Sequence, residues 1–159
     1  MREALMTTLA HISKSFRETF PVRASEWALA AILFNWSVVL FLQPDLFAKV
    51  GAFSSLAKLM PQVTFAGMCF LVGFGRLVSL AINGAWRRSP HLRAFGAFLG
   101  TGVWFMISIG IFRSGSGATG LGVYPILMLL DSYNVIRAAG EAGLSDHQNR
   151  RVADNGHPS

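Results

Sequence analysis

Charged residues are scarce in this sequence. Asp, Glu, Lys and Arg together make up 14% of the 159 residues, whereas an average soluble domain carries about 25%. Hydrophobic residues make up 52% of the chain, and the few charges fall in short segments between long apolar runs. A soluble domain spreads charge over its surface and hides its apolar residues in one core. The pattern therefore indicates a membrane protein.

Cysteine is nearly absent, and the familiar catalytic motifs are missing. The one cysteine, Cys69, lies in an apolar run and has neither a disulfide partner nor a CxxC partner for a metal. The four histidines lie in separate segments without HExxH spacing, and no GxSxG occurs. The glycine-rich stretch 113–122 lacks the GK[ST] ending of a phosphate-binding loop. We therefore expect no enzyme, no metal site and no cofactor.

Acidic residues are outnumbered, with 8 Asp and Glu against 14 Lys and Arg and a net charge of +6. No basic run exceeds two residues and no aromatic-basic motif accompanies them, so we do not expect nucleic acid as a partner. In a membrane protein, Lys and Arg mark cytoplasmic segments and contact anionic lipids. The predicted partners are the bilayer, with anionic lipids on its cytoplasmic side, and a membrane-protein partner or a second copy of the chain.

Four long apolar runs are present. They predict membrane-spanning helices over residues 25–42, 63–83, 94–112 and 118–136. Eighteen residues at 1.5 Å each cover about 27 Å, just enough to cross the hydrocarbon core. Pro44 and Pro61 bracket the segment between the first two runs, which predicts a short interfacial helix or a loop. We expect an all-α, integral membrane four-helix bundle over residues 25–137.

The two ends of the chain differ from the apolar runs. In residues 1–24, apolar side chains recur at helical spacing, which predicts an amphipathic helix on the membrane surface or one packed on a partner protein. Residues 138–159 are polar and contain glycine, which predicts a disordered tail. If both termini are cytoplasmic, only Lys49, Lys58 and Arg113 among the basic residues lie outside. This bias predicts a multi-pass membrane protein with that orientation.

Arg76 lies inside the second predicted span. An arginine near a helix centre costs about 2.5–3.5 kcal/mol on insertion scales, so its guanidinium should find a partner. Arg76 and Asp131 each lie about 9–10 Å from the cytoplasmic end of their spans. We predict that they pair if the two helices are neighbours. The pair would fix helix register or take part in ion or proton passage; alternatively, Arg76 reaches the headgroups.

Other polar and small residues are predicted to gather around this pair. A polar intramembrane cluster is expected from Arg76, Asp131, Asn35, Ser79, Asn83 and Asn134. Helix packing is expected at Gly96, Gly100, Gly73 and Gly75, the first two of which form a GxxxG pattern. Small residues let helix backbones approach closely. We expect this packing within the chain in preference to dimerisation.

Two stretches carry a resemblance. They are RLVSLAINGAWRRSPHLRAFGA, with Arg76, Asn83-Gly84, Trp86, Pro90 and Arg93, and TGLGVYPILMLLDSYNVIRAA, with Tyr124-Pro125 and Tyr133-Asn134. Together they resemble small four-span membrane proteins of unassigned role found in bacterial and phage genomes. The similarity covers roughly residues 25–140. It implies the four-span architecture and a place in the bacterial inner membrane, and it supplies no mechanism.

Three functions fit the sequence. The first is a non-catalytic accessory or assembly component that acts through membrane partners, indicated by short loops and the lack of a catalytic constellation. The second is a holin-like pore former, with which the small size and the amphipathic N-terminal segment are compatible. The third is a small ion or solute carrier that uses an intramembrane site at Arg76 and Asp131.

Overall fold

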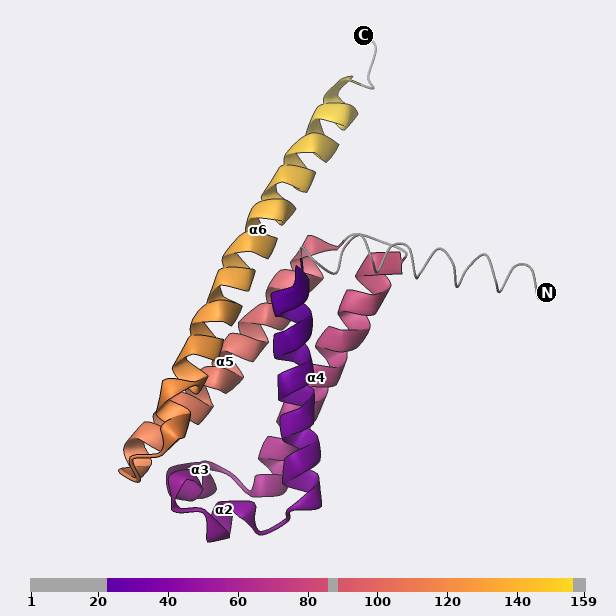
Figure 1. Cartoon of the computed structure of the whole chain (residues 1–159). Helices are drawn as coiled ribbons and strands as arrows, with labels where there is room; N and C mark the ends of the chain where they lie inside the picture. The colour runs from indigo at the N-terminus through magenta and orange to yellow at the C-terminus, as the bar shows by residue number, and fades with distance from the viewer. Residues whose placement is uncertain (1–22, 86–88, 156–159) are drawn as a thin grey trace, which may run out of the picture.

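The computed structural model describes residues 23–85 and 89–155. Every regular element within these residues is helical (Figure 1), which confirms the predicted all-α class. Three helices are long and apolar enough to cross a membrane: Arg23–Leu42, the part Gln62–Ile82 of α4 (Gln62–Ala85), and α5 (Pro90–Ser114). They indicate a membrane protein. The amphipathic helix predicted for residues 1–24 falls almost entirely outside the described residues.

The segment between Leu42 and α4 closes one end of the helices. It contains α2 (Leu46–Lys49), a 3-10 turn (Gly51–Phe53) and α3 (Ser54–Leu59), which lie across the lower end of the molecule in Figure 1. Two short helices therefore occupy the place where the sequence predicted one short helix or a loop. Leu56 of α3 packs on Gly110 of α5, where an added Cβ would lie 2.6 Å from the Leu56 Cγ. The contact holds the segment against the end of α5.

A glycine-rich turn joins α5 to the last helix, α6 (Tyr124–Asn155). Gly115 ends α5 with a φ of 67°, and Gly117 has a φ of 60°, a left-handed conformation that glycine adopts without strain. The next residues form a 3-10 turn (Thr119–Gly122), so the span predicted over 118–136 begins too early. Pro125 explains the later start, because proline is favoured in the first turn of a helix.

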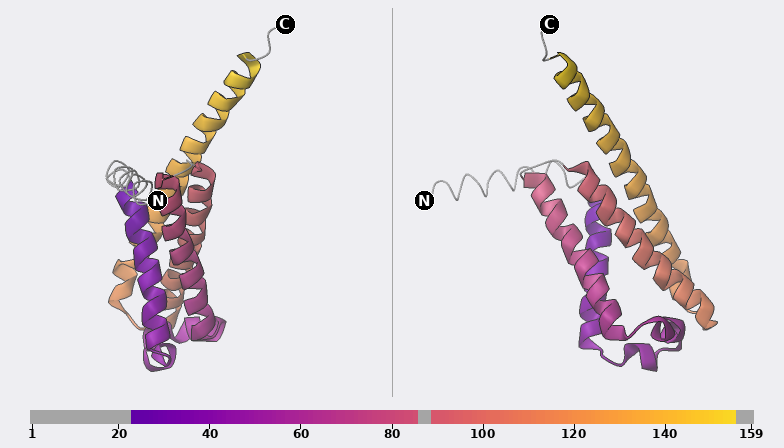
Figure 2. Two further views of the ribbon diagram at one scale, coloured as in Figure 1. Left: turned by 90° about the vertical axis from the view of Figure 1, so that its right-hand side faces the viewer. Right: turned by 180° about the vertical axis from the view of Figure 1, so that it is seen from behind.

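α6 also runs much farther than predicted. We expected a disordered tail from residue 138, yet α6 remains helical to Asn155 and projects beyond the other helices in both views of Figure 2. Ala138 and Ala142 are buried, and α6 lies alongside α5 (Figures 1 and 2). The polar composition of this segment suggested disorder, but its alanines and its contacts with α5 sustain the helix. α6 is not among the three helices that are long and apolar enough to cross a membrane.

The core lies where the four long helices meet. Trp36 makes edge-on contacts with Phe53, Phe65 and Tyr124, at ring-centroid distances of 5.7, 6.4 and 5.5 Å. Trp104 of α5 stacks on Tyr124 at 6.2 Å. The fully buried apolar side chains around these rings are Leu29, Leu33, Leu40, Leu56, Phe65, Cys69, Ile107 and Ile111. The Arg23–Leu42 helix, α3, α4, α5 and α6 thus share one core.

Candidate functional site

Arg76 of α4 and Asp131 of α6 form a buried, two-pronged ion pair. The Arg76 Nη1 and Nη2 atoms donate to the Asp131 Oδ2 and Oδ1 atoms, each at 2.6 Å. The Arg76 side chain is 6% exposed and that of Asp131 is 0% exposed. The predicted contact is therefore present, in the planar fork geometry that makes Arg–carboxylate pairs strong and directional.

Gly96 and Gly100 of α5 form the surface on which this ion pair lies. A Cβ on Gly96 would lie 3.1 Å from the Arg76 Cγ, and one on Gly100 would overlap the Arg76 Nη1 and the Asp131 Oδ2. We predicted that this GxxxG pattern would bring two helix backbones together. Instead it opens a path along which Arg76 crosses α5 to reach Asp131 on the far side.

The other two predicted packing glycines have different outcomes. A Cβ on Gly73 would lie 2.5 Å from the backbone nitrogen of Phe34, so α4 touches the Arg23–Leu42 helix backbone to backbone there. A Cβ on Gly75 would meet no neighbouring atom of the described residues within 4 Å, so Gly75 takes no part in packing. The prediction for Gly75 is wrong because it lies on a different face of α4 from Gly73.

The remaining members of the predicted polar cluster separate. Asn134 is fully buried, and its Oδ1 accepts a hydrogen bond from the Ser25 hydroxyl at 3.0 Å. Ser79 lines a cavity beside Arg76. Asn35 is exposed on the outer face of the Arg23–Leu42 helix, so its predicted place in the interior is wrong. The Asn83 side chain lies outside the described part of the chain.

A second ion-pair cluster, which sequence reasoning missed, lies at one end of the helices. Arg93 of α5 donates two hydrogen bonds to Glu26 of the first helix, from Nε to Oε2 at 2.9 Å and from Nη2 to Oε1 at 2.5 Å. Its third nitrogen donates to the Glu141 Oε2 of α6 at 2.5 Å. Arg137 completes the cluster, 3.3 Å from Glu26 and 3.7 Å from Glu141. Glu26 and Arg93 are 3% and 5% exposed.

The sequence contained a signal for this cluster. Glu26 and Arg93 each lie at a helix end on the same side of the predicted bundle, and they carry opposite charges. Glu141 was placed in a tail predicted to be disordered, so its carboxylate was not considered as a partner.

The charges around Glu141 change its acidity. Burial acts to raise the pKa of its carboxyl, but the hydrogen bond from Arg93 and the positive charges of Arg93, Arg23 and Arg137 outweigh that effect. The pKa is therefore held below its ordinary value. Glu141 stays ionised at neutral pH and remains a partner for Arg93, which ties α6 to α5.

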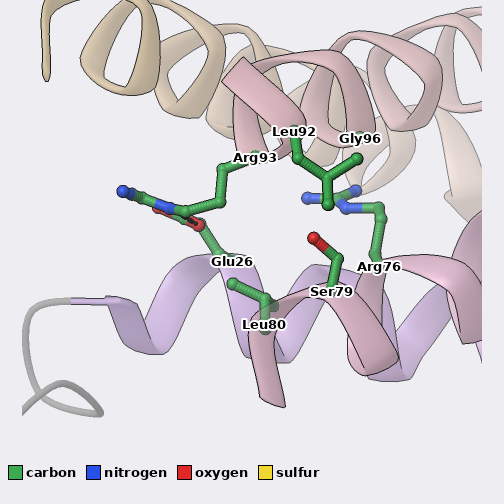
Figure 3. A pocket seen from close by; sticks show the side chains of 7 residues that line it. All are labelled: Glu26, Arg76, Ser79, Leu80, Leu92, Arg93 and Gly96. Carbon is green, nitrogen blue, oxygen red and sulfur yellow. Dashed lines mark hydrogen bonds and ion pairs between the residues drawn. The ribbon is translucent and has the colours of Figure 1, made fainter. Parts of the chain in front are cut away.

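The ion pairs of the two clusters join three guanidinium groups to three carboxylates, and Arg23 adds a further positive charge near Glu141. Between the two clusters lies a cavity of about 10 Å³, lined by Glu26, Arg76, Ser79, Leu80, Leu92, Arg93 and Gly96 (Figure 3). Such a volume holds one water molecule at most. The described residues also contain no group of three His, Cys, Asp or Glu that could hold a metal ion.

Comparisons with protein-family models, with curated proteins and with solved structures found no match to this chain. The site must therefore be interpreted from its own geometry. Its charged side chains are paired, its cavity has the size of a water molecule, and four helices contribute to it.

Proposed function

We propose that this chain is a non-catalytic, multi-pass protein of the bacterial inner membrane that acts as an accessory or assembly component. In this proposal α6 is the fourth span, and both termini lie in the cytoplasm, as the distribution of Lys and Arg favours. The ion pairs hold the four helices in register so that their outer faces meet lipid and partner helices.

One observation carries the proposal: the buried charges form ion pairs with one another, and the cavity beside them measures only about 10 Å³. A carrier needs an internal site that accepts a solute and opens to each side in turn. A pore needs a lumen lined by polar groups. The cavity beside the buried charges is too small for a solute, and these charges lie between helices, where an ion pair specifies register.

The first experiment tests the ion pair as a lock. Arg76→Ala and Asp131→Ala each leave an unpaired buried charge, which costs about 3–5 kcal/mol. We expect both variants to be scarce in the membrane, and the exchange Arg76→Asp/Asp131→Arg to restore abundance. Lys49→Ala is the matched control, because Lys49 is an exposed cation in an exposed pair with Asp45. Abundant single variants would contradict a structural role for the pair.

Membrane potential separates this proposal from pores and carriers. A voltage-sensitive dye is read during induced expression in bacteria, with wild type and the exchanged pair at matched abundance. We expect an unchanged potential in both. Depolarisation of the membrane by wild type but not by the exchanged pair would be the opposite result. That result would contradict the accessory role and indicate that the protein conducts ions through a site that uses Arg76.

The partner is tested separately from the fold. A photo-cross-linking amino acid is placed at Tyr133 or Ile136, which are 60% and 72% exposed on α6. We expect a discrete protein adduct from a position that faces a partner helix. The same amino acid at Ala138, which is 1% exposed, controls for adducts formed within the chain. Adducts with lipid alone at every outer position would count against a stable membrane partner.

A further inference from the structure

A polar hollow lies at the end of the molecule opposite the second ion-pair cluster, where α3 meets the end of α5. It has a volume of about 360 Å³, and its walls are Ser55, Leu56, Lys58 and Leu59 of α3 with Met106, Ile109, Gly110 and Arg113 of α5. The packing of Leu56 on Gly110 forms its floor. This hollow is separate from the buried clusters and takes no part in the proposed lock.

Two cations flank the hollow. Lys58 and Arg113 are both exposed, and neither forms an ion pair within the described residues. No acidic side chain is among the described residues that line it, and the Ser55 hydroxyl adds a hydrogen-bond donor. The third cation at this end, Lys49, is instead neutralised by Asp45 at 3.4 Å. The hollow therefore attracts an anion. Lys49, whose charge is neutralised by Asp45, attracts an anion less strongly than the hollow does.

The other wall of the hollow is apolar. Met106 and Ile109 lie on α5 between Arg113 and the middle of that helix, and Ile109 is 40% exposed. Seven residues separate Arg113 from Met106, a rise of about 10 Å along the helix. An occupant with its charge at Arg113 would extend an apolar part past Ile109 and Met106 toward the centre of the bilayer.

We propose that this hollow binds the headgroup phosphate of an anionic phospholipid, with one acyl chain lying along Met106 and Ile109. Lys58 and Arg113 bind the phosphate through charge-assisted hydrogen bonds. In the proposed topology this end of the molecule faces the outer leaflet, so the bound lipid belongs to that leaflet. The Arg113 guanidinium can hold two phosphate oxygens at once, and Lys58 supplies a second positive charge. The bound lipid braces α3 against α5.

The test is native mass spectrometry of the full chain, purified in detergent and incubated with phosphatidylglycerol or phosphatidylcholine. We expect one retained phosphatidylglycerol, bound at least tenfold more tightly than phosphatidylcholine. Lys58→Ala and Arg113→Ala should each weaken binding about fivefold, the effect of one cation near an anionic lipid. Lys49→Ala, at the same end of the molecule, should leave affinity unchanged.

Further measurements identify the molecule that binds in the hollow and control for misfolding of the variants. Glycerol 3-phosphate and inorganic phosphate carry the anion without chains, and we expect them to compete only weakly. Arg113→Lys keeps the charge but loses the two-pronged contact, so its affinity should lie between those of wild type and Arg113→Ala. Thermal unfolding of each variant in the same detergent shows whether a fall in affinity comes from lost folding. Equal binding of the two lipids, equal loss with Lys49→Ala, or full competition by inorganic phosphate would overturn the lipid site.

Discussion

At Gly100 a single methyl group would occupy the space that the Arg76–Asp131 ion pair fills. The residue therefore sets where a buried charge can lie, although it contributes no polar atom from its side chain. Gly102, two residues along the same helix, has nothing within 4 Å of a Cβ. The two glycines thus form a matched pair, one beneath the ion pair and one in open space.

Gly100→Ala should destabilise the protein strongly. Overpacking alone costs about 1–3 kcal/mol, and displacing the guanidinium also weakens both of its hydrogen bonds to Asp131. Gly102→Ala should be neutral or stabilising by about 0.5–1 kcal/mol, because alanine is the better helix former. Thermal unfolding of the purified variants in one detergent measures both. Equal melting temperatures would show that the ion pair can relocate.

Glu141 gives the protein a dependence on pH. Its folded pKa lies below the ordinary value, so its contribution is present at neutral pH and is lost as pH falls through the folded pKa. We expect the melting temperature of wild type to drop below about pH 4. The drop should be smaller in Glu141→Gln, which lacks the titrating carboxyl. An identical pH profile in the two proteins would show that Glu141 does not stabilise the fold.

Part of this site could be predicted from single residues. A lone buried charge costs so much free energy that Arg76 was expected to have a partner. Asp131 could be named as that partner because both residues lie at the same depth in their apolar runs. The crossing over Gly96 and Gly100 could not be predicted, since it depends on which helix lies between the other two. Asn35 was assigned to the interior on polarity alone, whereas the packing of its helix turns it outward.

At the scale of elements, Gln62 fastens the first helix to the second. Its Nε2 donates to the carbonyl oxygens of Leu40 and Gln43 at 2.8 and 2.5 Å, and its Oε1 accepts from the Phe47 N–H at 2.8 Å. The last carbonyls of a helix have no partner within it. One side chain at the start of α4 therefore satisfies the end of the Arg23–Leu42 helix and the start of α2.

Gln62→Leu should cost about 1–3 kcal/mol, because the substitution leaves buried backbone groups without partners. Gln43→Leu is the control, since the Gln43 side chain is exposed and contributes only its carbonyl. Denaturant or thermal unfolding in detergent measures the difference. A Gln62→Leu variant as stable as Gln43→Leu would mean that water replaces the lost hydrogen bonds.

The extents of the elements were predictable where apolar periodicity dominates. The runs 25–42, 63–83 and 94–112 coincide with the three span-like helices to within a residue at each end or fall inside them. Polar composition was a poor guide for α6, because Ala138 and Ala142 pack against neighbours that the sequence does not name. Pro125 marked the start of α6 and could have been used for that purpose.

At the scale of the whole molecule, the two ends of the helices carry different elements. The end with Glu26, Arg93 and Arg137 also carries the extension of α6, while α2, α3 and the α5–α6 turn lie at the other end (Figure 1). The first and last described helices therefore both have their free ends on one side of the bundle.

Reporter fusions test this orientation. Alkaline phosphatase fused after residue 155 should be inactive, and green fluorescent protein at the same place should fluoresce, because that end is predicted to be cytoplasmic. Phosphatase inserted at Gly117, in the turn at the opposite end, should be active. Active phosphatase at the C-terminus would reverse the proposed topology.

The distance along the chain between Arg76 and Asp131 bears on how the protein is made. The two residues are 55 positions apart, which ribosomes translate in about 3–11 s. Throughout that interval α4 exists without the carboxylate that neutralises its arginine. Until α6 is synthesised, the Arg76 guanidinium of the nascent helix must contact water, headgroups or the insertion machinery. The buried charge of α4 is therefore neutralised only when α6 arrives.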